Sequence, residues 1–191
     1  MPIFNDEITF IHIPKSGGTS ITAFIQSLGW KLSLHTPAVN TRINGHSPQH
    51  STLRELKNLN LLTRKVFAVV RPDVDRCISE FYYINRYMEN PWDRCTRFDS
   101  FLDVFLDKAN THIFDYHNVS NRSFLIDETG EIDPTIELID FFDIERIEKT
   151  LGATGLSSFH TFDSGSREGL KPTPEQRERI ERYFQTFESQ P

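Results

Sequence analysis

Three short, largely apolar runs along the chain predict buried β-strands. They extend from Ile8 to Ile13, from Val66 to Val70 and from Leu138 to Phe142. Short, continuous apolar runs rich in β-branched residues are typical of strands buried on both faces of a parallel sheet. The sequence therefore predicts a sheet whose strands are separated by long connections.

Helical patterns follow these runs. Apolar residues recur at helical spacing from Val74 to Met88, and a further helix is expected from Ile144 to Leu151. Thr173-Pro174-Glu175-Gln176 has the composition of a helix start. A polar patch from Asp115 to Ser123 precedes the short apolar stretch Phe124-Leu125-Ile126, which reads as another strand.

Alternating strands and helices predict an α/β fold with three layers, in which a central parallel sheet is flanked by helices. A chain of 191 residues fits one domain, and we expect residues 1–191 to form it. The sixteen phenylalanines make aromatic packing a prominent part of the core.

Charge and cysteine content narrow the classes of function. A formal net charge of −6 argues against nucleic-acid partners and anionic membranes, both of which favour basic surfaces. The two cysteines, Cys77 and Cys95, do not make a disulfide framework, and no run of residues has the spacing of a metal site. With no signal peptide or long apolar span in the sequence, we expect a cytoplasmic protein.

The first candidate for chemistry is the turn after the first strand. Pro14-Lys15-Ser16-Gly17-Gly18-Thr19-Ser20 joins that strand to a helical pattern. Glycines let backbone N–H groups converge on phosphate-like oxygens, and a helix N-terminus adds partial positive charge. Lys15 precedes the glycines, whereas the lysine of the common phosphate loop, G-x-x-x-x-G-K-[ST], follows them.

A second candidate lies at the end of the strand from Val66 to Val70. Arg71 stands at the C-terminal edge of this strand, and Ser79 lies two turns into the helix that follows. Ligands of open α/β sheets bind at that edge. A guanidinium and a hydroxyl group together suit a second phosphate.

Both segments resemble motifs of sulfotransferases that use 3′-phosphoadenosine 5′-phosphosulfate (PAPS). Residues 14–20 resemble the loop that binds the 5′-phosphosulfate, and residues 71–79 resemble the 3′-phosphate motif R-[DN]-P-[YWF]-[DE]-R-x-x-S. Two departures occur, since Pro72-Asp73 reverses the usual order and Val74 replaces the aromatic residue. The resemblance implies a sulfotransferase fold related to that of P-loop NTPases. It assigns the nucleotide to Lys15, Ser16, Gly17, Gly18, Thr19, Ser20, Arg71 and Ser79.

Sulfuryl transfer to a hydroxyl group benefits from a general base, for which histidine is best suited near neutral pH. His50-Ser51-Thr52-Leu53-Arg54-Glu55-Leu56 is similar to the H-x-x-x-x-E-L stretch of carbohydrate-type sulfotransferases, which implies that His50 is the base. His46 is the alternative, because Gly45-His46 also resembles a pair found in some members. Lys15 would stabilise the charge that develops on the leaving oxygen.

The resemblance extends to two further residues. His117, with Phe124 and Leu125, fits the H-x-x-P-Q-x-x-F-L segment that lines the acceptor side in the family, although Asn121 replaces the glutamine. Arg167 lies in a basic stretch, with Lys171, that family members close over the nucleotide.

The expected activity is therefore transfer of a sulfuryl group from PAPS to a hydroxyl acceptor, such as a carbohydrate or small molecule, without a metal ion. A nucleotide-dependent phosphotransferase or NTPase is one alternative. A non-catalytic module that binds a nucleotide such as 3′,5′-adenosine bisphosphate is another.

Overall fold

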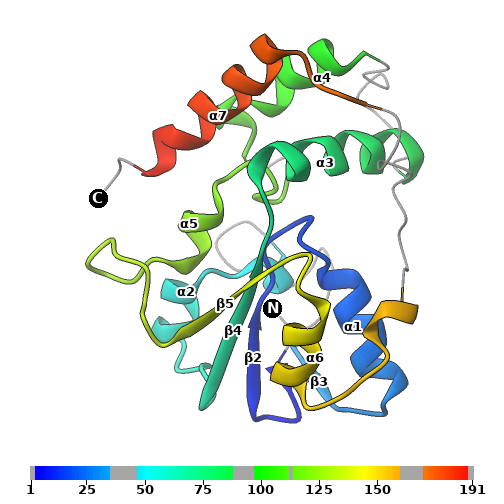
Figure 1. Ribbon diagram of the computed structural model, residues 1–191. Coiled ribbons are helices and arrows are strands. Elements are labelled where there is room, and N and C mark those ends of the chain that lie inside the picture. Colours follow the sequence, from blue (N-terminus) through cyan, green and yellow to red (C-terminus); the bar gives the residue numbers. More distant parts are fainter. Residues whose placement is uncertain (1–2, 35–46, 88–96, 112–113, 160–169, 189–191) are drawn as a thin grey trace.

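A computed structural model describes residues 3–34, 47–87, 97–111, 114–159 and 170–188. The described residues form an α/β structure around a five-stranded sheet with the strand order β3-β1-β2-β4-β5 (Figure 1). The strands are β1 (Ile3–Phe4), β2 (Ile8–Ile11), β3 (Leu32–Ser33), β4 (Lys65–Val70) and β5 (Ile136–Asp140).

The sheet is mixed, which corrects the expectation of a parallel one. Strands β2, β4 and β5 are parallel, as expected, but β1 runs antiparallel to both β2 and β3. The cause is a tight turn at Asn5 and Asp6, whose φ values of 50° and 60° fold β1 back onto β2. Consecutive residues with positive φ are typical of hairpin turns, and Asn and Asp tolerate that conformation best.

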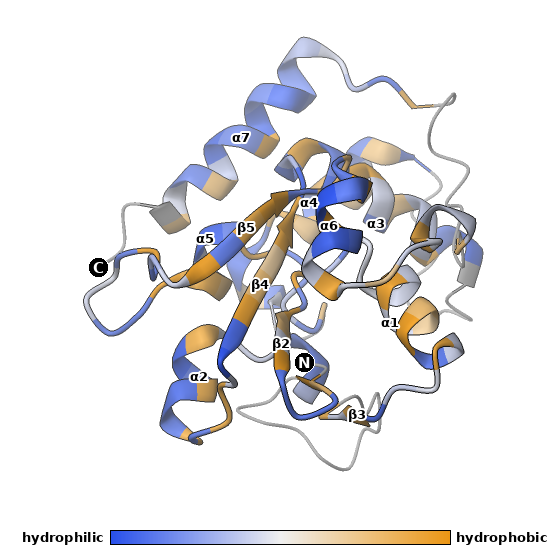
Figure 2. Ribbon diagram, turned by 60° about the horizontal axis from the view of Figure 1, so that its bottom comes forward, coloured by the Kyte–Doolittle hydropathy of each residue, from blue (hydrophilic) through white to orange (hydrophobic). Residues whose placement is uncertain are grey.

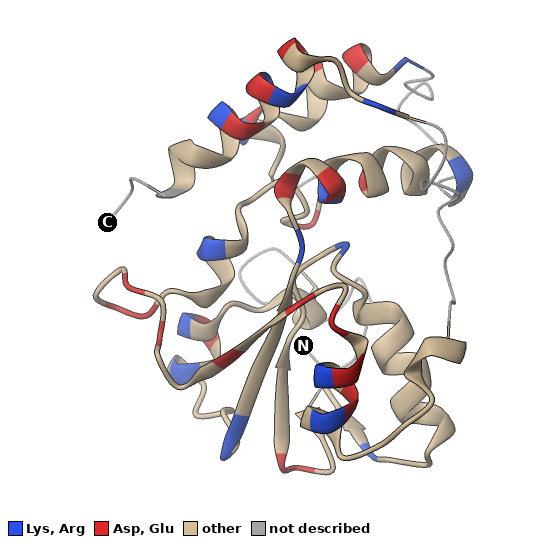
Figure 3. Cartoon of the chain, viewed as in Figure 1, with Lys and Arg blue, Asp and Glu red and all other residues tan. Residues whose placement is uncertain are grey.

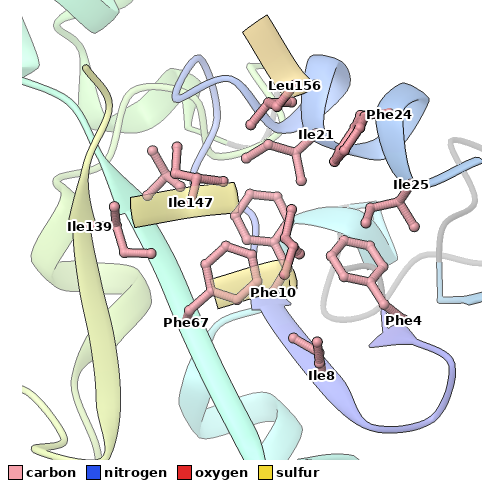
Figure 4. Packing of buried hydrophobic residues seen from close by; sticks show 12 residues of the cluster. Phe4, Ile8, Phe10, Ile21, Phe24, Ile25, Phe67, Ile139, Ile147 and Leu156 are labelled. Atoms are coloured by element: carbon pink, nitrogen blue, oxygen red, sulfur yellow. The ribbon is translucent and has the colours of Figure 1, made fainter. Parts of the chain in front are cut away.

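Helices cover both faces of the sheet. On one face, α1 (Gly18–Ser27) and α6 (Ile144–Leu151) pack on alternate residues of the strands, among them Phe10, Phe67 and Ile139 (Figure 4). On the other face, α2 (Leu53–Asn58) and α5 (Asn121–Leu125) pack on the residues in between. Because both faces are largely buried, most residues of the parallel strands are apolar, as Figure 2 shows; the charged residues of these strands are Lys65 on β4 and Glu137 and Asp140 on β5.

A third group of helices lies beyond the C-terminal ends of β2, β4 and β5. It consists of α3 (Asp73–Tyr87), α4 (Phe98–Phe105) and α7 (Pro174–Glu188), which share an apolar cluster of their own (Figure 1). Short 3₁₀ helices complete the secondary structure: η1 (Pro48–His50), η2 (Lys108–Asn110) and η3 (Leu156–Ser158). The C-terminal ends of β2, β4 and β5 therefore face this helical group.

Most of the predicted elements are confirmed, and one is wrong. The helices expected after Arg71, over Ile144–Leu151 and from Pro174 onward are present. Phe124 and Leu125, expected in a strand, instead end the short helix α5, because the Ser120 side chain accepts a hydrogen bond from the Ser123 N–H and caps the helix. Ile126 follows the helix in an extended conformation and forms an isolated β-bridge with Ile132. Charged residues lie mainly on helices and turns, whereas β2 carries none (Figure 3). No helix within the described ranges is long and apolar enough to cross a membrane.

Candidate functional site

The glycine loop, residues 14–20, joins β2 to α1 at the C-terminal edge of the sheet. Lys15 and Gly17 adopt the left-handed conformation, with φ values of 64° and 81°. For a lysine this conformation costs about 1–2 kcal/mol, so the surrounding contacts must hold it in place. Strained residues occur in tight turns as well as at functional sites, so this conformation makes the loop a candidate site.

Gly18 is required by the close approach of His12. A Cβ added at Gly18 would lie 1.9 Å from Nε2 of His12. The His12 ring is buried and stacks on Phe10, so it has little room to withdraw. His12 is therefore a packed residue, and it fixes the path of the loop.

The first turn of α1 is open to an anion. Gly17 is the N-cap residue, no side chain of the described residues caps the helix, and no acidic residue lies in its first turn. The first N–H groups of a helix have no acceptor within the helix, and they carry the positive end of its dipole. Thr19 is exposed and Ser20 half-buried at this end, whereas the Ser16 side chain is fully buried.

Lys15 and Arg71, which the sequence resemblance assigned to the two ends of the nucleotide, are in contact. Arg71 follows β4 directly, and its Nη1 donates a hydrogen bond of 3.2 Å to the carbonyl oxygen of Lys15. The guanidinium lies over the ring of Phe141, 4.6 Å from its centroid. Ser79 is buried on α3, and its neighbour Glu80 lies 3.9 Å from the Lys15 ammonium group.

His50 lies at the end of η1, where it is 3 % exposed. Its Nδ1 is 3.3 Å from the carbonyl oxygen of His12, and its Nε2 is 3.4 Å from Nε2 of His117. A carbonyl oxygen only accepts hydrogen bonds, so Nδ1 carries the hydrogen and Nε2 offers a lone pair. The Gln49 amide, with its nitrogen 3.2 Å away, also faces this Nε2.

His117 is held from the other side by Glu80. Its Nδ1 lies 2.8 Å from a carboxylate oxygen of Glu80, which is 3 % exposed. In its neutral form, with the Nδ1–H donating to Glu80, His117 also presents an Nε2 lone pair toward His50. Asp115 completes the group, because its Oδ2 is 3.7 Å from Nε2 of His50. We call His50, Asp115, His117 and Glu80 the histidine cluster.

Arg76 connects the glycine loop to the histidine cluster. It is 1 % exposed, and its Nε and Nη2 donate to the carbonyl oxygens of Pro14 and His117. Its Nη1 donates to Asp73 at 2.8 Å. Because its planar group binds several acceptors at fixed angles, Arg76 sets the distance between two segments that are far apart in the sequence.

Burial and charge act together on the ionisable groups. Burial lowers the pKa of Lys15, an effect that Glu80 opposes and Arg71 reinforces. Burial also lowers the pKa of His50 well below its usual range, and His12 and His117 add to this effect. Burial raises the pKa of Glu80, but His117, Lys15 and Arg76 outweigh it, so that the net pKa is lowered and Glu80 stays ionised.

Sequence reasoning found part of this site. The fold brings together Lys15, Arg71, His50 and His117, but Glu80 and Asp115 were missed. Glu80 directly follows a residue of the recognised motif, and its position one helical turn after Arg76 was the available signal. Nothing in the local sequence singled out Asp115. His46 and Arg167 lie outside the described residues, and Lys171 is exposed.

Comparison of this chain with protein-family models, curated proteins and solved structures finds no match. The site is therefore interpreted from its own geometry and chemistry.

Proposed function

We propose that this protein transfers a sulfuryl group from PAPS to a hydroxyl group of a carbohydrate or small-molecule acceptor, on the fold of the PAPS-dependent sulfotransferases. The observation that carries the proposal is the hydrogen bond from Arg71 to the carbonyl oxygen of Lys15. It brings the cation at the end of β4 against the glycine loop. Two anion-binding elements at one sheet edge suit a nucleotide with phosphates at two positions of its ribose.

The glycine loop would hold the 5′-phosphosulfate through the backbone of Gly17, Gly18 and Thr19 and the ammonium group of Lys15. Arg71, with Ser79, would hold the 3′-phosphate. The Lys15 ammonium group is balanced by Glu80 at 3.9 Å, and the ring of Tyr83 lies 3.8 Å from it. An anionic ligand would draw Lys15 away from these partners, because its phosphate oxygens carry more accessible negative charge.

The histidine cluster supplies the proton acceptor. The acceptor's hydroxyl oxygen attacks sulfur and forms the new S–O bond. The bond from sulfur to the bridging oxygen breaks, and 3′,5′-adenosine bisphosphate leaves. The hydroxyl proton would pass to Nε2 of His50 and be shared with Nε2 of His117, 3.4 Å away, where Glu80 on the far side of the His117 ring stabilises the resulting positive charge. His117 is the more exposed of the two rings, so an acceptor can reach it more readily than His50.

Calorimetry with 3′,5′-adenosine bisphosphate and with ATP–Mg²⁺ tests the nucleotide site. We expect magnesium-independent binding of the bisphosphate, and a loss of about 2 kcal/mol, or about 30-fold, in Arg71→Ala. Arg64→Ala is the matched control, since Arg64 is exposed just before β4. His50→Gln should bind the bisphosphate normally and lose turnover of PAPS. Preference for ATP–Mg²⁺ would instead support the phosphotransferase alternative, and bisphosphate binding without any turnover would support the binding module.

A further inference from the structure

The Nε2 atoms of His50 and His117 face each other at close range, and their hydrogen-bonding roles need an explanation. Both Nδ1 atoms lie against groups that accept hydrogen bonds, the His12 carbonyl oxygen at 3.3 Å and the Glu80 carboxylate at 2.8 Å. When both rings are neutral, both Nε2 atoms therefore carry lone pairs, and they lie only 3.4 Å apart. Two lone pairs repel each other unless a proton or another cation lies between them.

The separation of these atoms suits a metal ion. Zinc binds histidine nitrogen at about 2.0–2.1 Å in a tetrahedral arrangement, which places neighbouring ligand atoms about 3.3 Å apart. The distance between the two Nε2 atoms is 3.4 Å, and Oδ2 of Asp115 is 3.7 Å from Nε2 of His50. The three ligand atoms all lie within 4.8 Å of one another.

Asp115 is fixed in a position to act as the third ligand. Its Oδ1 accepts a hydrogen bond of 2.7 Å from the Ser47 N–H, and its Oδ2 accepts one of 2.5 Å from the Ser47 hydroxyl group. Asp115 and Tyr116 both have positive φ values, of 50° and 67°, which turn this segment toward His50. The Asp115 side chain is 28 % exposed, so a water molecule could reach the ion and supply the fourth ligand.

The hydrogen bonds made by the other ring nitrogen of each histidine are of the kinds found in metal sites. A histidine ligand usually donates its other ring N–H to a carboxylate or a backbone carbonyl oxygen, which fixes the ring and raises its basicity. His117 has the first kind of partner in Glu80, and His50 has the second in the carbonyl oxygen of His12. The amide of Gln49, which lies beside His50, can turn over and present its oxygen as well.

From this geometry we propose that His50, Asp115 and His117 form a binding site for a divalent transition-metal ion, with Zn²⁺ as the preferred ion. Two neutral imidazoles and one carboxylate, with an open position, are a donor set that zinc favours. Metal binding does not depend on the proposed sulfuryl transfer. Where both hold, the metal takes the lone pairs that would receive the acceptor's proton, so zinc inhibits the transferase.

Titration of the chelator-treated full chain with Zn²⁺, in the absence of nucleotide, tests this site. We expect one ion per chain with a Kd of about 1 μM or tighter. Co²⁺ in the same site should give the intense visible absorption of a four-coordinate ion. Asp115→Asn should weaken zinc binding at least about 10-fold, and Glu80→Gln, which weakens the contact behind His117 and also removes the charge beside Lys15, by about 10–100-fold.

Asp115→Asn is the decisive variant, because asparagine tolerates positive φ and can keep the hydrogen bond from the Ser47 N–H. Its circular dichroism spectrum and unfolding midpoint should match those of the parent. Asp127→Asn is the control, since Asp127 lies away from the cluster, in the turn after α5. Zinc binding that is absent in the parent, or that persists unchanged in Asp115→Asn, His50→Gln and His117→Gln, overturns the proposal. Bisphosphate calorimetry without metal reports separately on the proposed function.

Discussion

The glycine loop and the histidine cluster lie at the same edge of the sheet but are built in different ways. The loop is seven consecutive residues, 14–20, whose shape follows from the local backbone at Lys15 and Gly17 and from the approach of His12. The cluster takes its residues from η1, from α3 and from the turn before α5. A contiguous site depends on its own dihedral angles, whereas an assembled site depends on the contacts that hold distant segments together.

The largest effect should come from breaking the link between the two regions. Replacing Arg76 with methionine removes the donors to the Pro14 and His117 carbonyl oxygens and leaves Asp73 without its closest cation. Loss of one member of a buried ion pair costs about 3–5 kcal/mol, and we expect the free energy of unfolding to fall by this amount. Urea denaturation followed by circular dichroism measures it.

The matched control for this change is Arg182→Met on α7. Arg182 is exposed and pairs with Glu178 at the surface. Its replacement should alter the free energy of unfolding by no more than about 0.5 kcal/mol. If Arg76→Met were as stable as this control, or bound zinc and bisphosphate as the parent does, the two regions would be independent of each other.

The contrast between the regions also explains what the sequence could predict. Strand, turn and helix around Lys15 and Arg71 are encoded locally, in apolar runs and in residues that tolerate unusual dihedral angles. The pairing of His117 with Glu80 depends on how the turn before α5 packs on α3, which joins residues 37 positions apart. Local patterns carry no information about such contacts, so His50 and His117 were both named, but neither their facing arrangement nor Asp115 was.

The errors in the fold have a similar origin. The stretch Phe124-Leu125-Ile126 is apolar enough for a strand, and the competing signal was the cap at Ser120, which places Phe124 and Leu125 in α5. The antiparallel strand β1 was missed because it has only two residues, too few for a pattern to show. Its direction is set by the turn at Asn5 and Asp6.

A smaller effect should come from filling the space beside the loop. Gly18→Ala places a methyl group where the His12 ring lies, and the stacked ring cannot move far. Overpacking of this kind costs about 1–3 kcal/mol, and we expect the free energy of unfolding to fall by that amount. Because the His12 ring also contacts that of His50, with centroids 4.8 Å apart, zinc affinity should fall as well.

The double variant Gly18→Ala/His12→Ala distinguishes this clash from a general effect of alanine on the loop. The second change opens the space that the methyl group needs, so part of the lost stability should return. A double-mutant cycle would then give a favourable coupling energy of about 1 kcal/mol or more. Purely additive losses would mean that His12 does not set the path of the loop.

The smallest effect on stability should come from an ion pair near the N-terminal end of β5, away from both the glycine loop and the histidine cluster. A change to this pair serves as a control for changes in those two regions. Lys57 on α2 lies 2.6 Å from Asp133, which precedes β5. The hydrogen bond from Lys57, together with those from Thr135, lowers the pKa of Asp133 from 3.8 to about 2. A lowered pKa means that the pair stabilises the fold above about pH 4 and that this contribution is lost as the pH falls toward 2.

Without the pair, the free energy of unfolding should therefore fall less steeply as the pH is lowered from about 4 toward 2. Lys57→Met is expected to lower the free energy of unfolding by about 1 kcal/mol near neutral pH. This is less than the full pKa shift of Asp133 implies, because solvent screens the partly exposed lysine. The cost should shrink as the pH approaches 2, where Asp133 is protonated in the parent too. Zinc and bisphosphate affinities, measured at neutral pH, should not change. A loss of either affinity in Lys57→Met would show that general stability, rather than the contacts of Arg76 and His12, governs the two regions.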